Sequence, residues 1–415
     1  MATLHCDPAS DESLALMKGW LDNCKDSHQP CITTQQLGGP KRLLQCLPDG
    51  SVRLEMQSPT QRRDYIALSY CWDDGTAVKK TKKATEGDHQ RGIPSKDLPL
   101  LFQEAVALAR GLDTTYLWID SLCIIQDSKE DKEEEIMQMS NIFSGALVVV
   151  VVASAESPLD SLLRVKPQPA QSHTWRTASL IRHKEMDLDV KFRQRDMSAH
   201  TTTDATFSTP AGRQAWCFQE RLLASRCLVF RGDEVVWECR SCCLCECGGE
   251  QKHFSVRREP TMEPYRQGLL PLAKHEPFQL DGTLKTFPDA EAAYSFWEAT
   301  VWNYSRRELK LRTDRLPAIS AVASIVAKAT GDRYLAGLWR NDLLAGLCWV
   351  TAHQGDPRPH QEYIAPTWSW APLPGAVLYT RSRDADHQAT VINAWTVLKG
   401  PDPYGPVSDG AIVLS

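Results

Sequence analysis

The sequence lacks three features that mark specialised classes of protein: a basic excess, a long apolar run and a secretion leader. Its 415 residues include 47 Lys and Arg against 52 Asp and Glu, and the net charge of -5 excludes a dedicated nucleic-acid binder. The longest apolar run, residues 146–153, is too short to cross a bilayer. The first 20 residues carry acids where a signal peptide needs basic residues and an apolar stretch. We therefore expect a cytoplasmic chain with no membrane span and no nucleic-acid partner.

Nucleotide-binding and hydrolase motifs are also missing. The chain has no G-x-G-x-x-G, P-loop or G-x-S-x-G pattern, so neither a phosphate-binding loop nor a nucleophile elbow is predicted. Its composition is that of an ordinary globular protein, 42% apolar and 24% charged, and its length suits two to three domains. In a chain expected inside the cell, the 14 cysteines are predicted to be reduced thiols, core residues or metal ligands.

The clearest local pattern is an alternation of strands and helices between residues 65 and 153. Apolar runs at 65–72, 116–120 and 147–152 are typical of strands that are buried on both faces. Residues 99–110 and 128–144 between them have helical spacing, with a favourable first position or cap at each start. This order predicts adjacent parallel strands with the two helices as crossovers. Any ligand site is then expected beyond the carboxyl ends of the strands.

The rest of the chain is less regular. Residues 166–209 are polar and predict an insertion. A hairpin is predicted at 227–230 and 235–238, and helices are predicted at 289–307 and 317–329.

Five ordered blocks of the sequence resemble the HET (heterokaryon incompatibility) domain of filamentous fungi. The blocks are 67–72 (ALSYCW), 98–109, 116–127 (YLWIDSLCIIQD), 135–146 and 216–223 (WCFQERLL). Outside them, four features resemble segments that commonly flank the domain: the set Trp20, Cys24, His28 and Cys31, then 314–317 (DRLP), 334–339 (YLAGLW) and 367–370 (TWSW). Two positions depart from the family pattern, because Asp73 stands where Gly is usual and Lys132 lies where an aromatic residue is common.

The resemblance implies an α/β fold with a parallel sheet, remotely similar to a TIR domain. The expected division is an N-terminal segment at 1–63, the HET domain at 64–222 and an α+β region at 223–415. The implied function is fungal vegetative incompatibility, in which recognition of non-self leads to programmed cell death. The implied partners are other incompatibility proteins or further copies of the chain.

Two enzymatic alternatives remain beside this function. Some TIR domains cleave NAD, so the resemblance also allows an NAD glycohydrolase with NAD as its substrate. Some family members lie beside biosynthetic genes, which allows an accessory enzyme of secondary metabolism.

Residues that follow the predicted strands, together with the block at 216–223, predict a crevice for a ligand or for assembly. The predicted crevice residues are Cys71, Trp72, Asp73, Asp120, Cys123, Gln126, Asp127, Arg213, Gln219, Glu220 and Arg221. A structural interpretation competes with this one, because an Asp after a strand also caps helices and holds loops. In that interpretation Cys71 and Cys123 are small core residues, and Glu220 and Arg221 form a buried ion pair or tie a helix to the sheet.

Cleavage of NAD needs a carboxylate that stabilises an oxocarbenium-like transition state. The candidate carboxylates are Asp120, Glu135 and Glu156. In TIR enzymes the working Glu lies on the helix after the third strand, which points to Glu156, although Pro158 makes that position resemble a turn.

The densest group of thiols lies after the predicted hairpin. Cys239, Cys242, Cys245 and Cys247 contain a C-x-x-C element, which can bring two thiolates onto one zinc ion. Zinc sites usually join two such elements, and Cys24, His28 and Cys31 supply the second half if the N-terminal segment folds back. The alternative is a group of reduced loop thiols.

Overall fold

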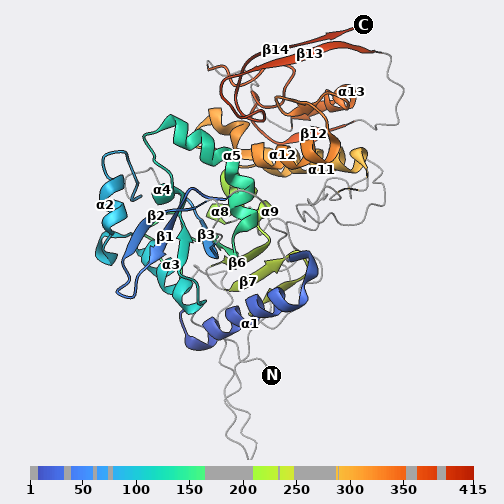
Figure 1. The fold of residues 1–415 in the computed structure, drawn as a ribbon. Coiled ribbons are helices and arrows are strands. Elements are labelled where there is room, and N and C mark those ends of the chain that lie inside the picture. Colours follow the sequence, from blue (N-terminus) through green and yellow to red (C-terminus); the bar gives the residue numbers. More distant parts are fainter. Residues whose placement is uncertain are drawn as a thin grey trace, which may run out of the picture.

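A computed structural model describes residues 8–31, 39–58, 63–72, 78–163, 209–231, 234–246, 287, 289–351, 362–380 and 389–415. Its centre is an eight-stranded sheet with the order β2-β1-β4-β3-β5-β6-β7-β8 (Figure 1). The strands are β1 (Arg42–Cys46), β2 (Val52–Met56), β3 (Tyr65–Ser69), β4 (Tyr116–Trp118), β5 (Val148–Val152), β6 (Arg226–Phe230), β7 (Val235–Cys239) and β8 (Cys243–Cys245).

The predicted parallel arrangement is confirmed. β3 pairs in parallel with β4 on one side and with β5 on the other, and β5 pairs in parallel with β6. All five valines of β5 are buried, as expected for a strand covered on both faces. β1 and β2 on one side, and β7 and β8 on the other, complete the sheet as antiparallel strands. The result is a mixed α/β sheet with a parallel centre.

The two predicted crossover helices are present. α3 (Leu100–Gly111) begins after Pro99, and α5 (Lys129–Gly145) begins after Ser128, whose side chain accepts a hydrogen bond from the amide of Asp131. β4 and β5 lie on opposite sides of β3, so right-handed connections place α3 and α5 on opposite faces of the sheet. α1 (Asp11–Ser27) packs beside α3, and α9 (Ala215–Leu223) packs beside α5.

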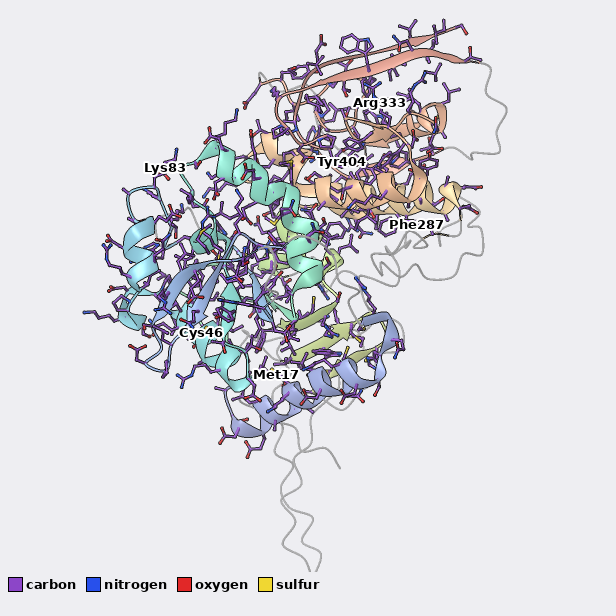
Figure 2. All side chains as sticks on the ribbon, in the orientation of Figure 1. Met17, Cys46, Lys83, Phe287, Arg333 and Tyr404 are labelled. Carbon is purple, nitrogen blue, oxygen red and sulfur yellow. The ribbon has the colours of Figure 1, made fainter. Side chains whose placement is uncertain are left out.

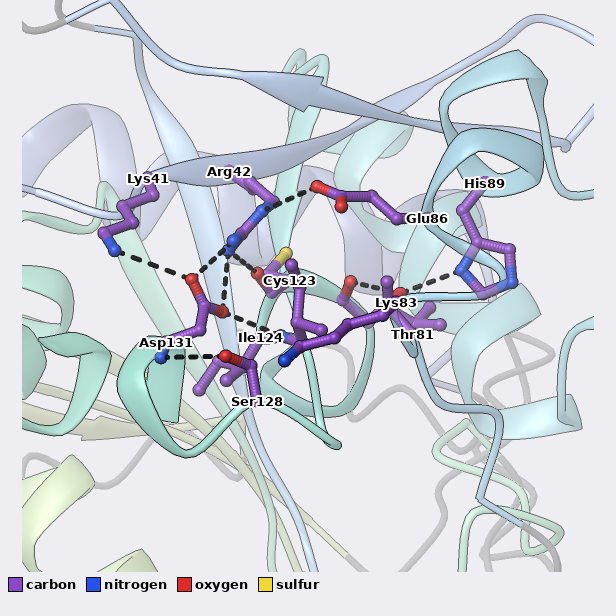
Figure 3. Close-up of polar contacts among 12 residues, drawn as sticks. Lys41, Arg42, Thr81, Lys83, Glu86, His89, Cys123, Ile124, Ser128 and Asp131 are labelled. Atoms are coloured by element: carbon purple, nitrogen blue, oxygen red, sulfur yellow. Dashed lines mark hydrogen bonds and ion pairs between the residues drawn. The ribbon is translucent and has the colours of Figure 1, made fainter. Parts of the chain in front are cut away.

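The sheet extends across both predicted domain boundaries. β1 and β2 precede residue 64, and β6, β7 and β8 follow residue 222, yet all five strands pair within the same sheet. β1 is further tied to α5 by Arg42, which donates two hydrogen bonds to Asp131 and one to the carbonyl of Cys123 (Figure 3). The expected division at 1–63, 64–222 and 223–415 thus remains a prediction from the sequence. In the structure, one sheet contains strands from all three segments.

Short helices complete the first half of the chain. They are η1 (Gln29–Cys31), α2 (Glu86–Arg91), η2 (Ser95–Asp97), α4 (Asp120–Cys123) and α8 (Pro210–Arg213).

The C-terminal part packs against α5 and α9. Its helices are α11 (Ala290–Ser305), η3 (Arg312–Arg315), η4 (Pro317–Ile319), α12 (Ser320–Thr330) and α13 (Leu343–Gly346). Its strands form three small antiparallel pairs: β9 (Tyr334–Leu335) with β10 (Leu338–Trp339), β11 (Trp349–Thr351) with β12 (Val377–Tyr379), and β13 (Val391–Leu398) with β14 (Val407–Leu414). The predicted helices at 289–307 and 317–329 and the predicted hairpin at 227–230 and 235–238 are confirmed.

Two of the flanking sequence features meet in this C-terminal part. The carbonyl of Gly337 accepts hydrogen bonds from the indole N–H groups of Trp297 and Trp370, at 2.9 Å and 3.0 Å. Gly337 has a φ of 101°, and a Cβ there would lie 2.6 Å from the Trp370 indole nitrogen, so only glycine fits. The segments 334–339 and 367–370 therefore form one aromatic core.

One large apolar core extends through the described part of the molecule, from Met17 on α1 to Tyr404 in the C-terminal part, which packs against it (Figure 2). No helix among the described residues has the length and apolar character that a bilayer crossing requires.

Candidate functional site

The order of the parallel strands fixes the place of the crevice. The chain passes from β3 to β4 on one side and later to β5 on the other, so the direction of the connections changes between β3 and β5, where a ligand crevice is expected. Tyr70, Cys71 and Trp72 follow β3, and Asp120 begins α4 just after β4. α8 closes over the end of β5, where the amide of Ala211 donates to the carbonyl of Ala153.

Asp120 is held on both carboxylate oxygens. The indole N–H of Trp72 donates to Oδ2 at 2.8 Å, and the amide of Ser121 donates to Oδ1 at 2.7 Å. Burial raises the pKa of Asp120 to about 6, while these hydrogen bonds act in the opposite direction. The ammonium of Lys80 lies 5.1 Å from the centre of the Trp72 ring. Asp120 is half-buried, so its charge lies at the mouth of the crevice.

Glu220 on α9 supplies a second carboxyl group to this crevice. Its side chain is buried, and its Oε2 makes no hydrogen bond to any described residue. Burial, followed by the neighbouring Cys217 and Asp120, raises the pKa of Glu220 well above its usual value. Neighbouring carboxyl groups whose pKa values are both raised are typical of functional sites.

The thiols predicted to line the crevice are buried core groups. Cys71 and Cys217 form a small buried cluster with Ala211, and Cys217 Sγ lies 3.5 Å from the carbonyl oxygen of Tyr70. Contact with Cys71 and burial raise the pKa of Cys217 well above its usual value, which makes this thiol a poor nucleophile. Cys123 lies in the main core instead, and burial raises its pKa as well.

Two of the remaining predicted crevice residues hold the loop after β4. The side-chain amide of Gln126 donates to the carbonyl of Asp120 at 3.0 Å, and Asp127 Oδ1 accepts from the amide of Lys83 at 2.8 Å. Both contacts fit the structural interpretation of these residues. Asp73 lies outside the described residues.

The other predicted residues of the 213–221 region contact the C-terminal part and β7. Gln219 accepts from the amide of Ala321 at the start of α12, and Arg213 lies 3.9 Å from Glu308. The buried guanidinium of Arg221 donates to Glu238 on β7, with Nε and Oε2 2.9 Å apart. The predicted tie between helix and sheet therefore exists, with Glu238 as the partner of Arg221.

The structure places Glu135 and Glu156 apart from these groups. Glu135 is buried on α5, accepts from the amide of Lys41 at 3.1 Å, and has its pKa raised to about 7, mainly by burial. Glu156 is exposed on the loop after β5. Among the described residues, the first helices after the third parallel strand are α8 and α9, and α9 carries Glu220.

Two hollows border this region. The smaller, about 20 Å³, lies between the end of β5 and α9 beside Cys217 and has room for about one water molecule. The larger, about 480 Å³, follows α11 and is of the size of a small-molecule site. Its wall carries Arg306, Arg307, Arg312 and Arg315. The smaller hollow, beside Cys217, therefore has room for water but not for a small-molecule ligand.

The cysteines predicted to bind zinc have different surroundings in the structure. Cys239 ends β7, and the Sγ of Cys242 lies 3.6 Å from that of Cys239. The thiol of Cys245 donates to Glu234 at 3.1 Å, and Cys247 lies outside the described residues. The structure brings Cys239 together with Cys24, His28 and Cys31, whose ligand atoms all lie within 4.8 Å of one another.

The residues predicted to line the crevice did not include Tyr70, Ser121 or Cys217. The helical spacing of Cys217 and Glu220 was the available signal, because residues three apart share one face of a helix. Tyr70 donates to Ser121 Oγ at 3.1 Å, a contact between the residue after β3 and helix α4 that no local pattern indicates.

The fold and these contacts define an α/β protein with two neighbouring carboxyl groups, the buried Glu220 and the half-buried Asp120, near the carboxyl end of a parallel sheet. Residues 65–220, which contain both Asp120 and Glu220, match the model of the family described as Heterokaryon incompatibility protein (HET). The resemblance predicted from the sequence is confirmed for this region.

The chain is also similar to "Heterokaryon incompatibility protein 6, OR allele" of Neurospora crassa. The two are 39% identical over 93 residues, which is 21% of this chain and 14% of the length of the relative. The match is thus confined to a small part of both proteins. No solved structure matches the chain.

Proposed function

We propose that this protein acts in fungal vegetative incompatibility, as a cytoplasmic signalling module that causes growth arrest and programmed cell death. The observation that supports the proposal is the location of the family match. Residues 65–220 contain both Asp120 and Glu220, and the curated relative bears the name of an incompatibility protein. The partner is another incompatibility protein or a second copy of the chain.

In this proposal the charge of Asp120 is the functional group. Trp72 and Ser121 fix the orientation of its carboxylate, which remains half-buried at the mouth of the crevice. A fixed carboxylate of this kind suits recognition of a basic group on a partner. Glu220 is buried beside Cys217, and its role in this proposal is to fill that space.

An NAD glycohydrolase is the second candidate, and one observation favours it. In the described part of the chain, α9 with Glu220 belongs to the first helices after the third parallel strand, and in TIR enzymes the working Glu lies on the helix after that strand. A carboxyl group there, near Asp120, has the chemistry needed to stabilise an oxocarbenium-like transition state. The hollow beside Cys217 holds about one water molecule, so substrate entry there requires movement of α8, which lines it.

Glu220→Gln distinguishes the two functions, because glutamine reproduces the neutral form of a buried glutamate. The variant is expressed in a filamentous fungus from an inducible promoter, beside the wild type and the exposed control Glu156→Gln. Signalling through Asp120 predicts growth arrest by all three chains and no nicotinamide release from NAD by the purified proteins. The enzymatic function predicts nicotinamide release by the wild type, with loss of both release and arrest in Glu220→Gln.

A further inference from the structure

We propose that Cys24, His28, Cys31 and Cys239 bind one structural zinc ion that fastens the N-terminal helix to the sheet. The four ligand atoms, three sulfurs and one ring nitrogen, all lie within 4.8 Å of one another. The proposal is independent of the incompatibility function, because the quartet lies outside residues 65–220.

The first three ligands are brought together by the end of α1. Cys24 lies in the last turn of the helix, and His28 follows one turn later as the C-cap, with its amide donating to the carbonyl of Cys24. The turn η1 then continues the bend, because the amide of Cys31 donates to the carbonyl of His28 at 2.8 Å. The spacing C-x-x-x-H-x-x-C thus places three donor groups on one side of a short segment.

The fourth ligand comes from the end of β7. Cys239 Sγ accepts hydrogen bonds from the amides of Ser241 at 3.4 Å and Cys242 at 3.3 Å. Amides that point at one sulfur favour its thiolate form, which is the form that binds zinc. Cys239 Sγ also lies 3.3 Å from His28 Nδ1, although the two residues are 211 positions apart in the chain.

These distances suit a tetrahedral zinc site. With zinc–sulfur bonds of about 2.3 Å and zinc–nitrogen bonds of about 2.0 Å, neighbouring ligands are about 3.5–3.8 Å apart. The separation of Cys239 Sγ and His28 Nδ1 is close to this value. The Sγ of Cys242 lies 3.6 Å from that of Cys239, but Cys242 is outside the quartet of mutually close ligands.

Burial and charge favour zinc over free thiols. Cys24, Cys31 and Cys239 are each 0% exposed, and His28 is half-buried at the edge. The buried guanidinium of Arg226 donates to Cys24 Sγ at 3.3 Å and to the carbonyl of Cys31 at 2.8 Å. Three thiolates and one imidazole around Zn²⁺ carry a net charge of about -1, and Arg226 balances it.

The first test measures metal in the full chain, purified without chelator and with no polyhistidine tag. Elemental analysis is expected to find about one zinc per chain. X-ray absorption at the zinc edge is expected to show three sulfurs at about 2.3 Å and one nitrogen at about 2.0 Å. A folded, metal-free protein overturns the proposal, as does iron in place of zinc. Four sulfurs overturn the assignment of His28 in favour of Cys242.

The second test uses variants with matched controls. Cys31→Ser and His28→Ala are expected to bind zinc at least about tenfold more weakly. Cys242→Ser and Cys245→Ser, which alter thiols of the same region outside the quartet, are expected to retain it. Full retention by the first two variants contradicts the proposal. If these variants fail to fold, the absorption spectrum of the wild type still decides the ligand set.

Discussion

The ion pair between Arg42 and Asp131 gives the sharpest prediction about stability. Both side chains are buried, and the contact joins β1, which lies outside residues 65–220, to the first turn of α5 (Figure 3). Asp131 accepts from Arg42 at 2.5 Å and 3.1 Å and from the amide of Ile125 at 2.8 Å. Asp131→Ala removes all three hydrogen bonds and leaves the guanidinium buried without its main partner.

The expected cost follows from these contacts. Loss of one member of a buried ion pair destabilises a protein by about 3–5 kcal/mol, because a buried charge is left unpaired. Arg42 keeps its hydrogen bond to the carbonyl of Cys123 at 2.9 Å, and Glu86 lies 3.5 Å away, so we expect about 3 kcal/mol. Ser128→Ala, which removes the N-cap of α5 and the hydrogen bond from Ser128 Oγ to Glu130, is expected to cost about 1 kcal/mol.

Urea unfolding followed by circular dichroism measures these free energies of unfolding. The double variant Arg42→Met/Asp131→Leu removes both charges and is expected to be more stable than Asp131→Ala. A change of less than about 0.5 kcal/mol in Asp131→Ala refutes the reasoning, because surface substitutions already have effects of that size.

Two further predictions concern buried titratable groups. Burial raises the pKa of the Glu135 carboxyl group from 4.5 to about 7, so the folded chain binds the carboxyl proton more tightly than the unfolded chain. The contribution of Glu135 to the free energy of unfolding is therefore fully present below about pH 4.5 and is lost as the pH rises through about 7. Glu135→Gln is therefore expected to stabilise the protein by about 2–4 kcal/mol at pH 8 and by little at pH 5, and equal effects at both pH values in urea unfolding contradict this. Cys217→Ala removes a thiol whose pKa is well above its usual value, so growth arrest in the expression assay is expected to persist, and its loss argues for a nucleophilic thiol.

The centre of the fold was predictable because its signals are local. The valines of β5 leave no alternative to a buried strand, and Ser128 with the acidic residues after it marks the start of α5. β1 and β2 were not predicted, since their sequences RLLQC and VRLEM are short and mix apolar with polar residues. Their place in the sheet depends on pairing with β4, a contact between distant segments.

The candidate sites show the same limit. Spacing brought Asp120 and Glu220 into one predicted crevice, but it gave no sign that Arg221 faces Glu238 or that Glu135 is covered by the segment before β1. The metal quartet was split between two sequence motifs, and the C-x-x-C pattern favoured Cys242 and Cys245 over the N-terminal ligands. Only the packing of α1 beside β7 selects Cys239 as their partner.

Asp120→Asn is the most direct test of the proposed function, because it removes the charge and preserves the size of the side chain. The variant is expressed in a filamentous fungus at the same protein level as the wild type and the exposed control Asp97→Asn, and colony growth is measured after induction. We predict that the wild type and Asp97→Asn arrest growth, and that Asp120→Asn is inactive while its melting temperature stays within about 3 °C of the wild type. A folded Asp120→Asn variant that arrests growth as strongly as the wild type contradicts the claim that this charge carries the function.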